Sequence, residues 1–452
     1  MAAITPDKVH EILGRHMLAD GFDMVLDLER STPFRIVDSR EDRAFLDFFT
    51  FFASSPLGVN HPKLDTPEFR ERLGRVAVNK PSNSDLYTLE MAELVETMDR
   101  VAIPDHLPHL FFVSGGALAV ENALKVAFDW KVRKNMAEGR GEKGSKVLHF
   151  RWAFHGRSGY TMSLTNTADP RKYMYFPRFD WPRIDPPELT FPVDPERARI
   201  RDDAALKAVA EAFAADRDDI AAVIVEPIMA EGGDKHLSSY FLQGLGRLCD
   251  ENDAMFILDE VQTGVGLTGT FWAHQGLEVT PDIIAFGKKT QVCGILAGPK
   301  VDRVEKHCFE ESSRINSTWG GNLVDMVRFT RILEIIEEDG LVDNAREVGG
   351  YLLEGLSGLQ EEFSMVTNVR GRGLLCAFDL PDGGMRDEFL NRAYSEGILI
   401  LGCGTRSIRF RPPLQTTREH VDDGLEAVRS ILGQLASEGS TAAAAQADLP
   451  SE

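Results

Sequence analysis

The sequence lacks the marks of a secreted, zinc-binding or membrane protein. Its 452 residues include five cysteines, an odd number with no CxxC pair, which indicates reduced thiols rather than a disulfide framework or a metal site. No apolar run approaches the roughly 20 residues of a membrane span. Asp7 and Glu11 interrupt the region where a signal peptide would need an apolar core. We therefore expect a cytoplasmic protein.

Positive charge is also scarce. The chain has 50 Lys and Arg against 71 Asp and Glu, a net charge of −21. Such a field repels phosphate backbones and anionic membrane surfaces, so neither nucleic acid nor membrane is an expected partner. The length is sufficient for a large core and for more than one domain, which permits an enzyme.

Short apolar runs alternate with helical patterns through the middle of the chain. The runs are "LFFV", "KVLHF", "AAVIVEPI", "AMFILDEV" and "DIIAFG". This rhythm is typical of an α/β fold, in which helices cover a mostly parallel sheet. We assign residues 56–320 to this large domain.

After residue 320 the pattern changes. An amphipathic stretch from Leu323 to about Phe363 predicts one long helix that could bridge two lobes. Strand patterns in "GLLCAFDL", "GILILG" and "SIRFRPPL" then predict a smaller α+β domain over residues 321–437. We expect residues 1–55 to pack with this domain, and residues 438–452 to form a disordered tail because they contain few large apolar side chains.

Two adjacent lysines, Lys288 and Lys289, follow the run "DIIAFG". The run "AMFILDEV" ends with Asp259 and Glu260, so an acid and an amine would meet at the carboxyl edge of the sheet, where open α/β sheets bind ligands. No GxxxxGK[ST] motif accompanies them, which argues against a nucleotide hydrolase. The sequence instead predicts a site that needs a carboxylate and an amine together.

A glycine motif supplies an alternative from another class. Gly264, Gly266 and Gly269 form a GxGxxG after a strand, which is typical of NAD-dependent oxidoreductases when the glycines open a helix. Here two polar residues separate the strand from the glycines. A plain glycine-rich loop is therefore the favoured interpretation.

Pyridoxal phosphate is a cofactor that needs both an amine and an acid. Its aldehyde forms a Schiff base with a lysine, and a carboxylate keeps its ring nitrogen protonated. Its phosphate needs backbone amides, preferably at a helix N-terminus. The segment "LFFVSGGALAVENALKVAFDW" supplies a strand, a turn at Gly115 and Gly116, and a helical pattern. These features together predict a pyridoxal phosphate site.

Several motifs in order resemble the class III (ω-amino) aminotransferases of pyridoxal phosphate fold type I. The resemblance runs from about Asp38 to Leu435 and rests on "GGALAVENALK", "AFHGRSGY", "VEPI" with "EGGD", "LDEVQTGVGLTG", "PDIIAFGK", "NSTWGGN" and "IRFRPPL". It implies a homodimer of chains with a large and a small domain. "NKPSNSD" and "FGKKTQVCG" most resemble members that transfer the ε-amino group of L-lysine to 2-oxoglutarate, and 4-aminobutyrate or ornithine transaminases are the alternatives.

The resemblance also implies roles for single residues. Lys288 would be the Schiff-base amine and proton carrier, and Asp259 would pair with the ring nitrogen. Lys289 receives no role, and we expect it to be a solvated surface amine, as most lysines are. The other cofactor residues would be Gly116 and Ala117 at the phosphate through backbone amides, Phe154 and Val261 on the two ring faces, Gln262 at the phenolic oxygen, His155 nearby, and Thr318 at the phosphate from the partner subunit.

Substrate recognition would rest on arginines, since 2-oxoglutarate carries two carboxylates. Arg157 would bind the carboxylate at the far end of the substrate, with Asn316 lining the same pocket. Arg409 would grip the α-carboxylate of the oxo acid in a bidentate way, and Glu231 would neutralise it during the amino-donor half-reaction. Arg411 would share the face of Arg409 on a regular strand, so geometry alone leaves it open as an alternative.

Overall fold

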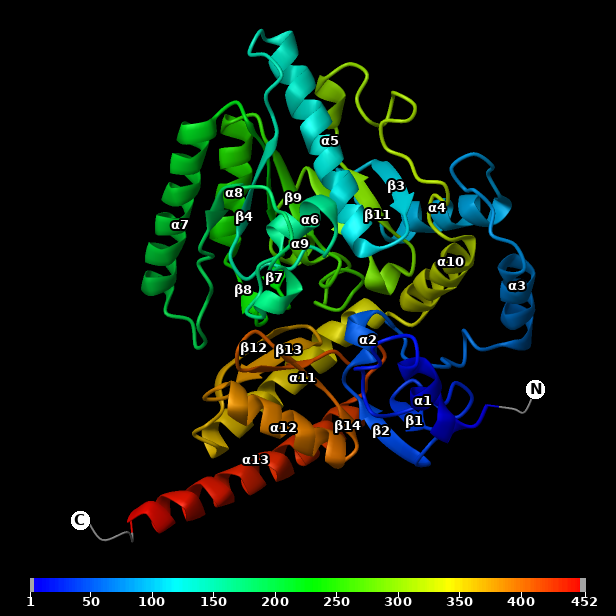
Figure 1. The fold of residues 1–452 in the computed structure, drawn as a ribbon, viewed down its shortest axis with the longest axis vertical. Helices are drawn as coiled ribbons and strands as arrows, with labels where there is room; N and C mark the ends of the chain where they lie inside the picture. Colours follow the sequence, from blue (N-terminus) through cyan, green and yellow to red (C-terminus); the bar gives the residue numbers. More distant parts are fainter. Residues whose placement is uncertain (1–3, 448–452) are drawn as a thin grey trace.

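The computed structural model describes residues 4–447 and contains a seven-stranded sheet in the upper part of Figure 1. Its order is β3 (His109–Val113), β11 (Cys293–Ala297), β10 (Ile283–Phe286), β9 (Met255–Asp259), β6 (Ile220–Val225), β4 (Lys146–Phe150) and β5 (Arg183–Ile184). The predicted mostly parallel sheet is confirmed. The exception is β11, which runs antiparallel to β3 and β10 and was not predicted from the sequence.

Both faces of this sheet are covered. Along β9, Met255 and Ile257 join the apolar cluster beneath α5 (Gly116–Ala137), whereas Phe256 and Leu258 join the cluster that contains α8 (Ser239–Glu251). Alternation of this kind follows from the two-residue period of a strand. α7 (Pro195–Asp216) packs on α8, and Figure 1 shows the pair on the left of the sheet. Burial on both faces explains why the strands read as continuous apolar runs.

Two smaller sheets lie in the lower part of Figure 1. The antiparallel sheet has the order β12 (Thr367–Arg372), β13 (Leu375–Asp379), β16 (Ser407–Phe410) and β15 (Leu401–Cys403). In the other, β1 (Arg35–Asp38) and β2 (Arg43–Asp47) are completed by β14 (Ile398–Leu399), which runs parallel to β2. α12 (Gly383–Ser395) and α13 (Arg418–Ala447) pack on each other here. The N-terminal segment therefore pairs with a strand about 350 residues later.

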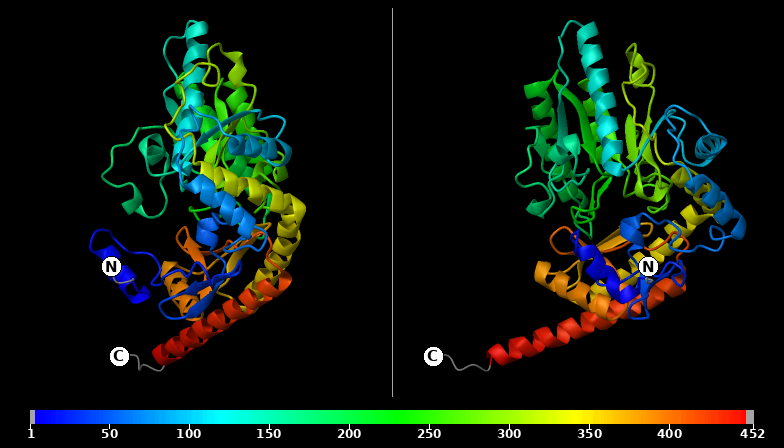
Figure 2. Two further views of the ribbon diagram at one scale, coloured as in Figure 1. Left: turned by 90° about the vertical axis from the view of Figure 1, so that its right-hand side faces the viewer. Right: turned by 45° about the vertical axis from the view of Figure 1, so that its right-hand side comes forward.

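The predicted single helix over 323–363 is wrong in one respect. Two helices occur, α10 (Leu323–Glu338) and α11 (Leu341–Glu362), and Gly340 between them has φ +60°. Glycine adopts this left-handed conformation without steric cost, so it ends one helix and redirects the chain. α10 packs on α4 (Leu89–Val101) and α11 packs on β12. Figure 2 shows the two helices running from the upper part of the molecule to the lower.

The predicted disordered tail also differs from the structure. α13 continues to Ala447, past residue 438, where the sequence predicted that order would end. The segment is rich in alanine, which has the highest intrinsic helix propensity. Residues 448–452 lie outside the described residues.

Among the described residues, no helix is long and apolar enough to cross a membrane.

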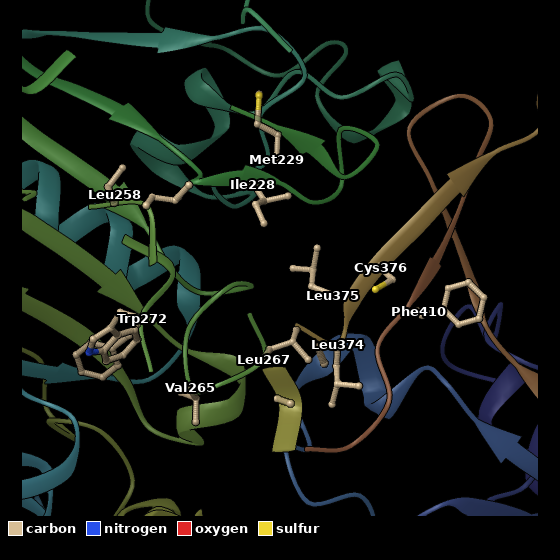
Figure 3. Packing of buried hydrophobic residues seen from close by; sticks show 14 of the residues in the cluster. Ile228, Met229, Leu258, Val265, Leu267, Trp272, Leu374, Leu375, Cys376 and Phe410 are labelled. Carbon is tan, nitrogen blue, oxygen red and sulfur yellow. The ribbon is translucent and has the colours of Figure 1, made fainter. Parts of the chain in front are cut away.

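One apolar cluster joins the upper and lower parts of the molecule. The carbonyl oxygen of Leu267, in the loop after β9, accepts a hydrogen bond from the backbone N–H of Leu374, at 2.9 Å from nitrogen to oxygen. Figure 3 shows Val265 and Leu267 beside Leu374 and Leu375, and Ile228 lies above them in this view. The continuous packing fixes the edge of the large sheet against β13.

Candidate active site

A cavity of about 590 Å³ lies where β3, β6, β9 and β10 end. It lies at the carboxyl edge of these parallel strands, the usual ligand-binding edge of an open α/β sheet. Most of the site residues predicted from the sequence line it: Gly116, Ala117, Phe154, His155, Arg157, Glu231, Asp259, Val261, Gln262 and Lys288. The predicted acid and amine therefore share one cavity.

The two acids that end β9 have different surroundings. Asp259 faces the cavity, where its Oδ2 lies 2.8 Å from His155 Nδ1 and its Oδ1 accepts the Val261 N–H at 3.1 Å. Glu260 points the opposite way and accepts hydrogen bonds from the backbone of Ala273 and His274. Successive residues at a strand end project to opposite sides. Asp259 is thus available to a ligand, and Glu260 holds the following loop.

Lys288 follows β10 and directs its amine into the same cavity. Burial, followed by the charge of Arg409, lowers the pKa of Lys288 to about 8, although Asp259 opposes the shift. With the Gln262 amide oriented to satisfy both of its ends, its oxygen accepts from Lys288 Nζ at 2.9 Å and its nitrogen donates to the Phe52 carbonyl at 3.2 Å. An amine with this lowered pKa is a better nucleophile near neutral pH than an exposed lysine.

The prediction that Lys289 is a solvated surface amine is wrong. Lys289 is 1% exposed, and its Nζ donates to the carbonyl of Gln262 at 2.7 Å and to that of Ala53 at 3.4 Å. The chain forms a 3₁₀ turn over Lys288–Thr290, and the side of this turn facing away from the cavity is covered by the segment around Ala53. Sequence could not show this cover, because it comes from more than 200 positions away.

We expect Lys289→Met to lower the free energy of unfolding by about 1–3 kcal/mol at alkaline pH, where the amine is uncharged in both states, because it leaves two buried carbonyls without a donor. Burial, and then the neighbouring Lys288, hold the pKa of Lys289 well below 10.5. The folded protein therefore holds fewer protons at this amine than the unfolded chain does, so the residue's contribution to stability should rise with pH toward 10.5 and fall as pH decreases.

Thermal unfolding at neutral and alkaline pH measures both effects of Lys289→Met. At alkaline pH the variant should melt at a lower temperature than the wild type. This difference should shrink toward neutral pH, because the variant lacks this part of the pH dependence. Lys207→Met is the matched control, because the Lys207 side chain is 78% exposed and should contribute little. A melting temperature unchanged in Lys289→Met at alkaline pH would contradict the assignment.

The start of α5 forms a cradle for an anion. Gly115, the N-cap residue, has φ +107°, and no side chain caps the helix. The first N–H groups of the helix therefore have no partner within it. They form the positive end of the helix dipole, which faces the cavity. A Cβ atom added at Gly116 would lie 3.3 Å from Val261, so the cradle leaves little room for a side chain.

Glu226 is a cavity residue that received no role from the sequence. It follows β6 directly and accepts the backbone N–H groups of Phe154 at 2.9 Å and Ala230 at 3.2 Å. Burial raises the pKa of Glu226 to about 7, and Asp259 adds to the shift while His155 opposes it. Its place after a predicted strand, parallel to the one that ends in Asp259, is the signal that could have identified it.

Glu231 and Arg409 form the predicted pair. Glu231 Oε2 accepts from Arg409 Nη2 at 3.0 Å, and Glu231 Oε1 accepts from Lys172 Nζ at 2.5 Å. Burial would raise the pKa of Glu231, but Arg409 and then Lys172 outweigh it, so this pKa lies below its usual value. Arg409 Nε and Nη1 are buried and have no hydrogen-bond partner in the part of the chain that the structure describes. No sequence signal marked Lys172, which ends the short 3₁₀ turn Pro170–Lys172.

The structure also separates Arg409 from Arg411. Both guanidinium groups are buried, but Arg411 Nη2 donates to Asp234 at 2.5 Å, and Asp234 is fully buried. Arg411 is therefore closed in a structural ion pair, whereas Arg409 keeps two donors free. The turn that carries Glu231 and Asp234 supplies one acid to each arginine. The pairing with the buried Asp234 argues against the alternative role for Arg411.

Arg157 lines the cavity mouth and is exposed, with no ion-pair partner among the described residues. Asn316 and Thr318 do not line this cavity and are exposed in a loop of the same chain. There, Ser82 Oγ donates to the Thr318 carbonyl and Ser84 Oγ to that of Ser317, both at 2.5 Å. Within one chain, therefore, two predicted site residues remain apart from the others.

An unpredicted turn brings two aromatic side chains into the cavity. Thr50, Phe51, Phe52 and Ala53 have φ values from +40° to +59°, and this short segment is α2 (Thr50–Ala53). Left-handed backbone costs roughly 1–2 kcal/mol per residue outside glycine. Asp47 Oδ1 accepts the N–H of Thr50 at 2.8 Å, and Thr50 Oγ1 donates to the Arg411 carbonyl at 2.7 Å. These contacts hold Phe51 and Phe52 at the cavity wall.

The GxGxxG motif does not open a helix. Residues 261–270 form turns, and the next helix, α9 (Ala273–Gly276), has four residues. Gly266 and Gly269 both have φ +80°, and Arg346 donates to the Gly269 carbonyl at 2.9 Å. The glycines therefore shape a packed loop, and the structure removes the basis of the NAD-dependent alternative.

Comparisons with known proteins agree with this geometry. The sequence profile described as Aminotransferase class-III matches residues 18–432. An L-lysine-epsilon aminotransferase from Mycobacterium tuberculosis is 53% identical over 431 residues, which cover 95% of this chain and 96% of that protein. A 4-aminobutyrate aminotransferase from Emericella nidulans is 32% identical over 438 residues, covering 91% and 86%. A solved lysine aminotransferase from M. tuberculosis, in the internal aldimine form, matches with a TM-score of 0.94 at 53% identity, covering 95% of this chain and 99% of that chain.

Proposed function

The chain belongs to the class III aminotransferases, and from this premise we propose that it transfers the ε-amino group of L-lysine to 2-oxoglutarate. The products are 2-aminoadipate 6-semialdehyde and L-glutamate. The observation that supports an ω-amino donor is the ion pair between Glu231 and Arg409 beside the amine of Lys288. Lysine is favoured among such donors by the 53% identity to L-lysine-epsilon aminotransferases, against 32% to a 4-aminobutyrate aminotransferase.

The family implies pyridoxal phosphate, and the cavity residues fit it. The free N–H groups at the start of α5 match a phosphate, and Lys288 and Asp259 face the same space. Val261 and Phe154 line the cavity as apolar walls for a flat ring, and Gln262 would hydrogen-bond its phenolic oxygen. His155 would orient Asp259 through the contact of 2.8 Å.

Pyridoxal phosphate, when bound, supplies an aldehyde for covalent attachment and a ring that withdraws electrons. Lys288 would hold the cofactor through its amine and, once that amine is free, move a proton from Cε of the substrate lysine. Asp259 would keep a proton at the ring nitrogen, because a carboxylate at that atom favours its charged form. The lowered pKa of Lys288, about 8, suits an amine that must accept and release a proton near neutral pH.

The cations explain how one site takes two unlike substrates. The reacting carbon of 2-oxoglutarate carries a carboxylate, whereas Cε of lysine carries a hydrogen atom in its place. Arg409, buried and with two free donors, would bind that carboxylate in the second half-reaction. Glu231 would neutralise Arg409 in the first. Arg157 at the mouth would bind the far carboxylate of both substrates.

A donor panel tests the function directly. With 2-oxoglutarate as acceptor, we expect kcat/KM for lysine to exceed those for ornithine and 4-aminobutyrate by about 10-fold or more, since a methylene is worth about 1–3 kcal/mol in a fitted pocket. Lysine labelled with ¹⁵N at the ε position should give ¹⁵N-glutamate, detected by mass spectrometry, and the aldehyde product can be trapped with an amine reagent.

Lysine labelled at the α position is the matched control and should give unlabelled glutamate. Label transfer from the α position would contradict the proposed regiochemistry. A higher kcat/KM for ornithine or 4-aminobutyrate would show that lysine is not the preferred donor, although the protein would still be an ω-aminotransferase.

We also infer a cytoplasmic homodimer. Asn316 and Thr318 are exposed and lie outside the cavity of their own chain, whereas Ser114, Gly115 and Leu118 at the start of α5 are exposed beside it. Thr318 of the partner subunit would complete the phosphate contacts there, and Asn316 of the partner subunit would line the substrate pocket. The negative net charge agrees with the absence of nucleic acid among the proposed partners.

A further inference from the structure

Lys172 is a cavity residue that the proposed chemistry does not yet use. It ends a 3₁₀ turn, Pro170–Lys172, that begins with Asp169 as its N-cap. Its Nζ lies 2.5 Å from Glu231 Oε1 and 5.7 Å from the centroid of the Phe154 ring. The side chain is 23% exposed, so the ammonium lies where the cavity meets solvent. The turn and the ring together fix a cation against Glu231.

The carboxylate of Glu231 bridges two cations through separate oxygens. Oε1 takes the ammonium of Lys172, and Oε2 takes the guanidinium of Arg409 at 3.0 Å. The Arg409 side chain is 3% exposed, whereas that of Glu231 is 29% exposed. Because the two contacts use different oxygens, Glu231 can release Arg409 and keep Lys172. The direction of that movement is outward, from the buried cation toward the partly solvated one.

We propose that Lys172 is a positioning residue that holds Glu231 by an ion pair after Glu231 has released Arg409 to the carboxylate of the oxo acid. The inference rests on the proposed function and deepens it. Without Lys172, Arg409 would be the only cation paired to Glu231, and an incoming carboxylate would have to expel Glu231 into a partly buried place without a partner. A buried charge that loses its partner is destabilised. With Lys172, the exchange replaces one ion pair by another.

The charge balance of the cavity supports this assignment. Arg157 and Lys172 are cations that line the cavity together with Glu231. Glu231 pairs with Lys172 and with the buried Arg409. An oxo acid with two carboxylates can satisfy Arg157 and Arg409, which leaves Lys172 for Glu231. With lysine as the ligand, Glu231 stays between Lys172 and Arg409, so neither cation is left facing the ammonium groups of the substrate.

A competing role for Lys172 is direct contact with a substrate carboxylate. Both roles predict weaker binding of 2-oxoglutarate when the ammonium is removed, but they differ in how they depend on Glu231. A positioning role acts through Glu231 and disappears when Glu231 carries no charge. A direct contact persists in that background. A double-mutant cycle between the two positions therefore separates them.

The experiment uses the full enzyme loaded with pyridoxal phosphate. Its variants are Lys172→Met, Lys172→Arg, Glu231→Gln and the double variant that combines Lys172→Met with Glu231→Gln. Binding of glutarate, a dicarboxylate without an oxo or amino group, is measured by calorimetry, and the two half-reactions are measured in single turnovers. Lys172→Met should weaken glutarate and 2-oxoglutarate by about 10-fold, within the usual range of couplings between sites, and should change the lysine half-reaction much less. Lys172→Arg should restore binding.

In the Glu231→Gln background, Lys172→Met should have no further effect on glutarate. Arg171→Met is the matched control, because Arg171 is the sequence neighbour, is 83% exposed and, among the described residues, pairs only with Asp169. Its glutarate binding should match the wild type. Equal losses in both half-reactions, unchanged glutarate binding in Lys172→Met, or a loss that persists in the Glu231→Gln background would each overturn the proposal. A donor other than lysine would overturn only the proposed function, since glutarate binding involves no amino donor.

Discussion

Lys288→Ala should lower kcat by at least about 10⁴-fold, the upper range for removal of a positioned acid–base group. The loss has two causes, because Lys288 is both the covalent anchor of the cofactor and the group that moves the substrate proton. Single-turnover rates with lysine measure the second role. Borohydride reduction followed by peptide mass spectrometry measures the first, since it fixes pyridoxal phosphate to the amine that holds it.

The adjacent lysine provides a sharp control for Lys288→Ala. Lys289→Met should retain the reduced adduct on Lys288, because the Lys289 amine is turned away from the cavity and donates to the Gln262 and Ala53 carbonyls. An adduct that persists in Lys288→Ala, or one that disappears in folded Lys289→Met, would contradict the assignment of the two residues.

The lowered pKa of Lys288 adds a pH dependence to the same test. Only the uncharged amine attacks an aldehyde, so the rate at which the cofactor-free protein captures pyridoxal phosphate should rise with pH around a midpoint of about 8, well below the ordinary lysine value of 10.5. Burial and the charge of Arg409 cause this displacement. A capture rate for pyridoxal phosphate that rises only near the ordinary lysine pKa of 10.5 would contradict the lowered pKa of Lys288.

Asp259→Asn should lower kcat by about 10²–10³-fold, the usual loss when one preorganised electrostatic contact is removed from a reacting group. Asparagine retains an oxygen for the Val261 N–H but carries no charge to hold a proton at the ring nitrogen. Covalent attachment through Lys288 should remain, because the anchor is a separate group. The primary isotope effect with lysine deuterated at Cε should increase, since proton removal becomes slower relative to binding.

Glu260→Gln is the matched control for Asp259→Asn. Glu260 accepts hydrogen bonds from the backbone N–H groups of Ala273 and His274, at 3.0 and 2.9 Å, and has no contact with the cavity. We expect this variant to melt at a lower temperature and to retain kcat per bound cofactor within a few-fold, as for a structural residue. Equal losses of kcat in the two variants would mean that Asp259 and Glu260 do not have the separate roles that the geometry indicates.

Much of the large sheet could be predicted from sequence because its strands are buried on both faces. β6 and β9 therefore appear as continuous apolar runs, and each ends with an acid at the same edge. β11 was missed because "CGILA" follows the lysine pair without an α-helix between, which breaks the alternation of strands and helices. The break between α10 and α11 was missed because one glycine inside a long amphipathic pattern does not reveal its backbone conformation.

The sequence by itself determined which residues end the buried strands, and hence that Asp259 and Lys288 share a cavity, since local apolar patterns and the parallel-sheet rule are sufficient for that. Only the tertiary structure decided which neighbour of each pair faces a ligand. Lys289 is buried because an N-terminal segment covers it, and Arg411 is closed because Asp234 reaches it while Glu231 reaches Arg409. These partners lie more than 170 positions away along the chain, so no local pattern contains them.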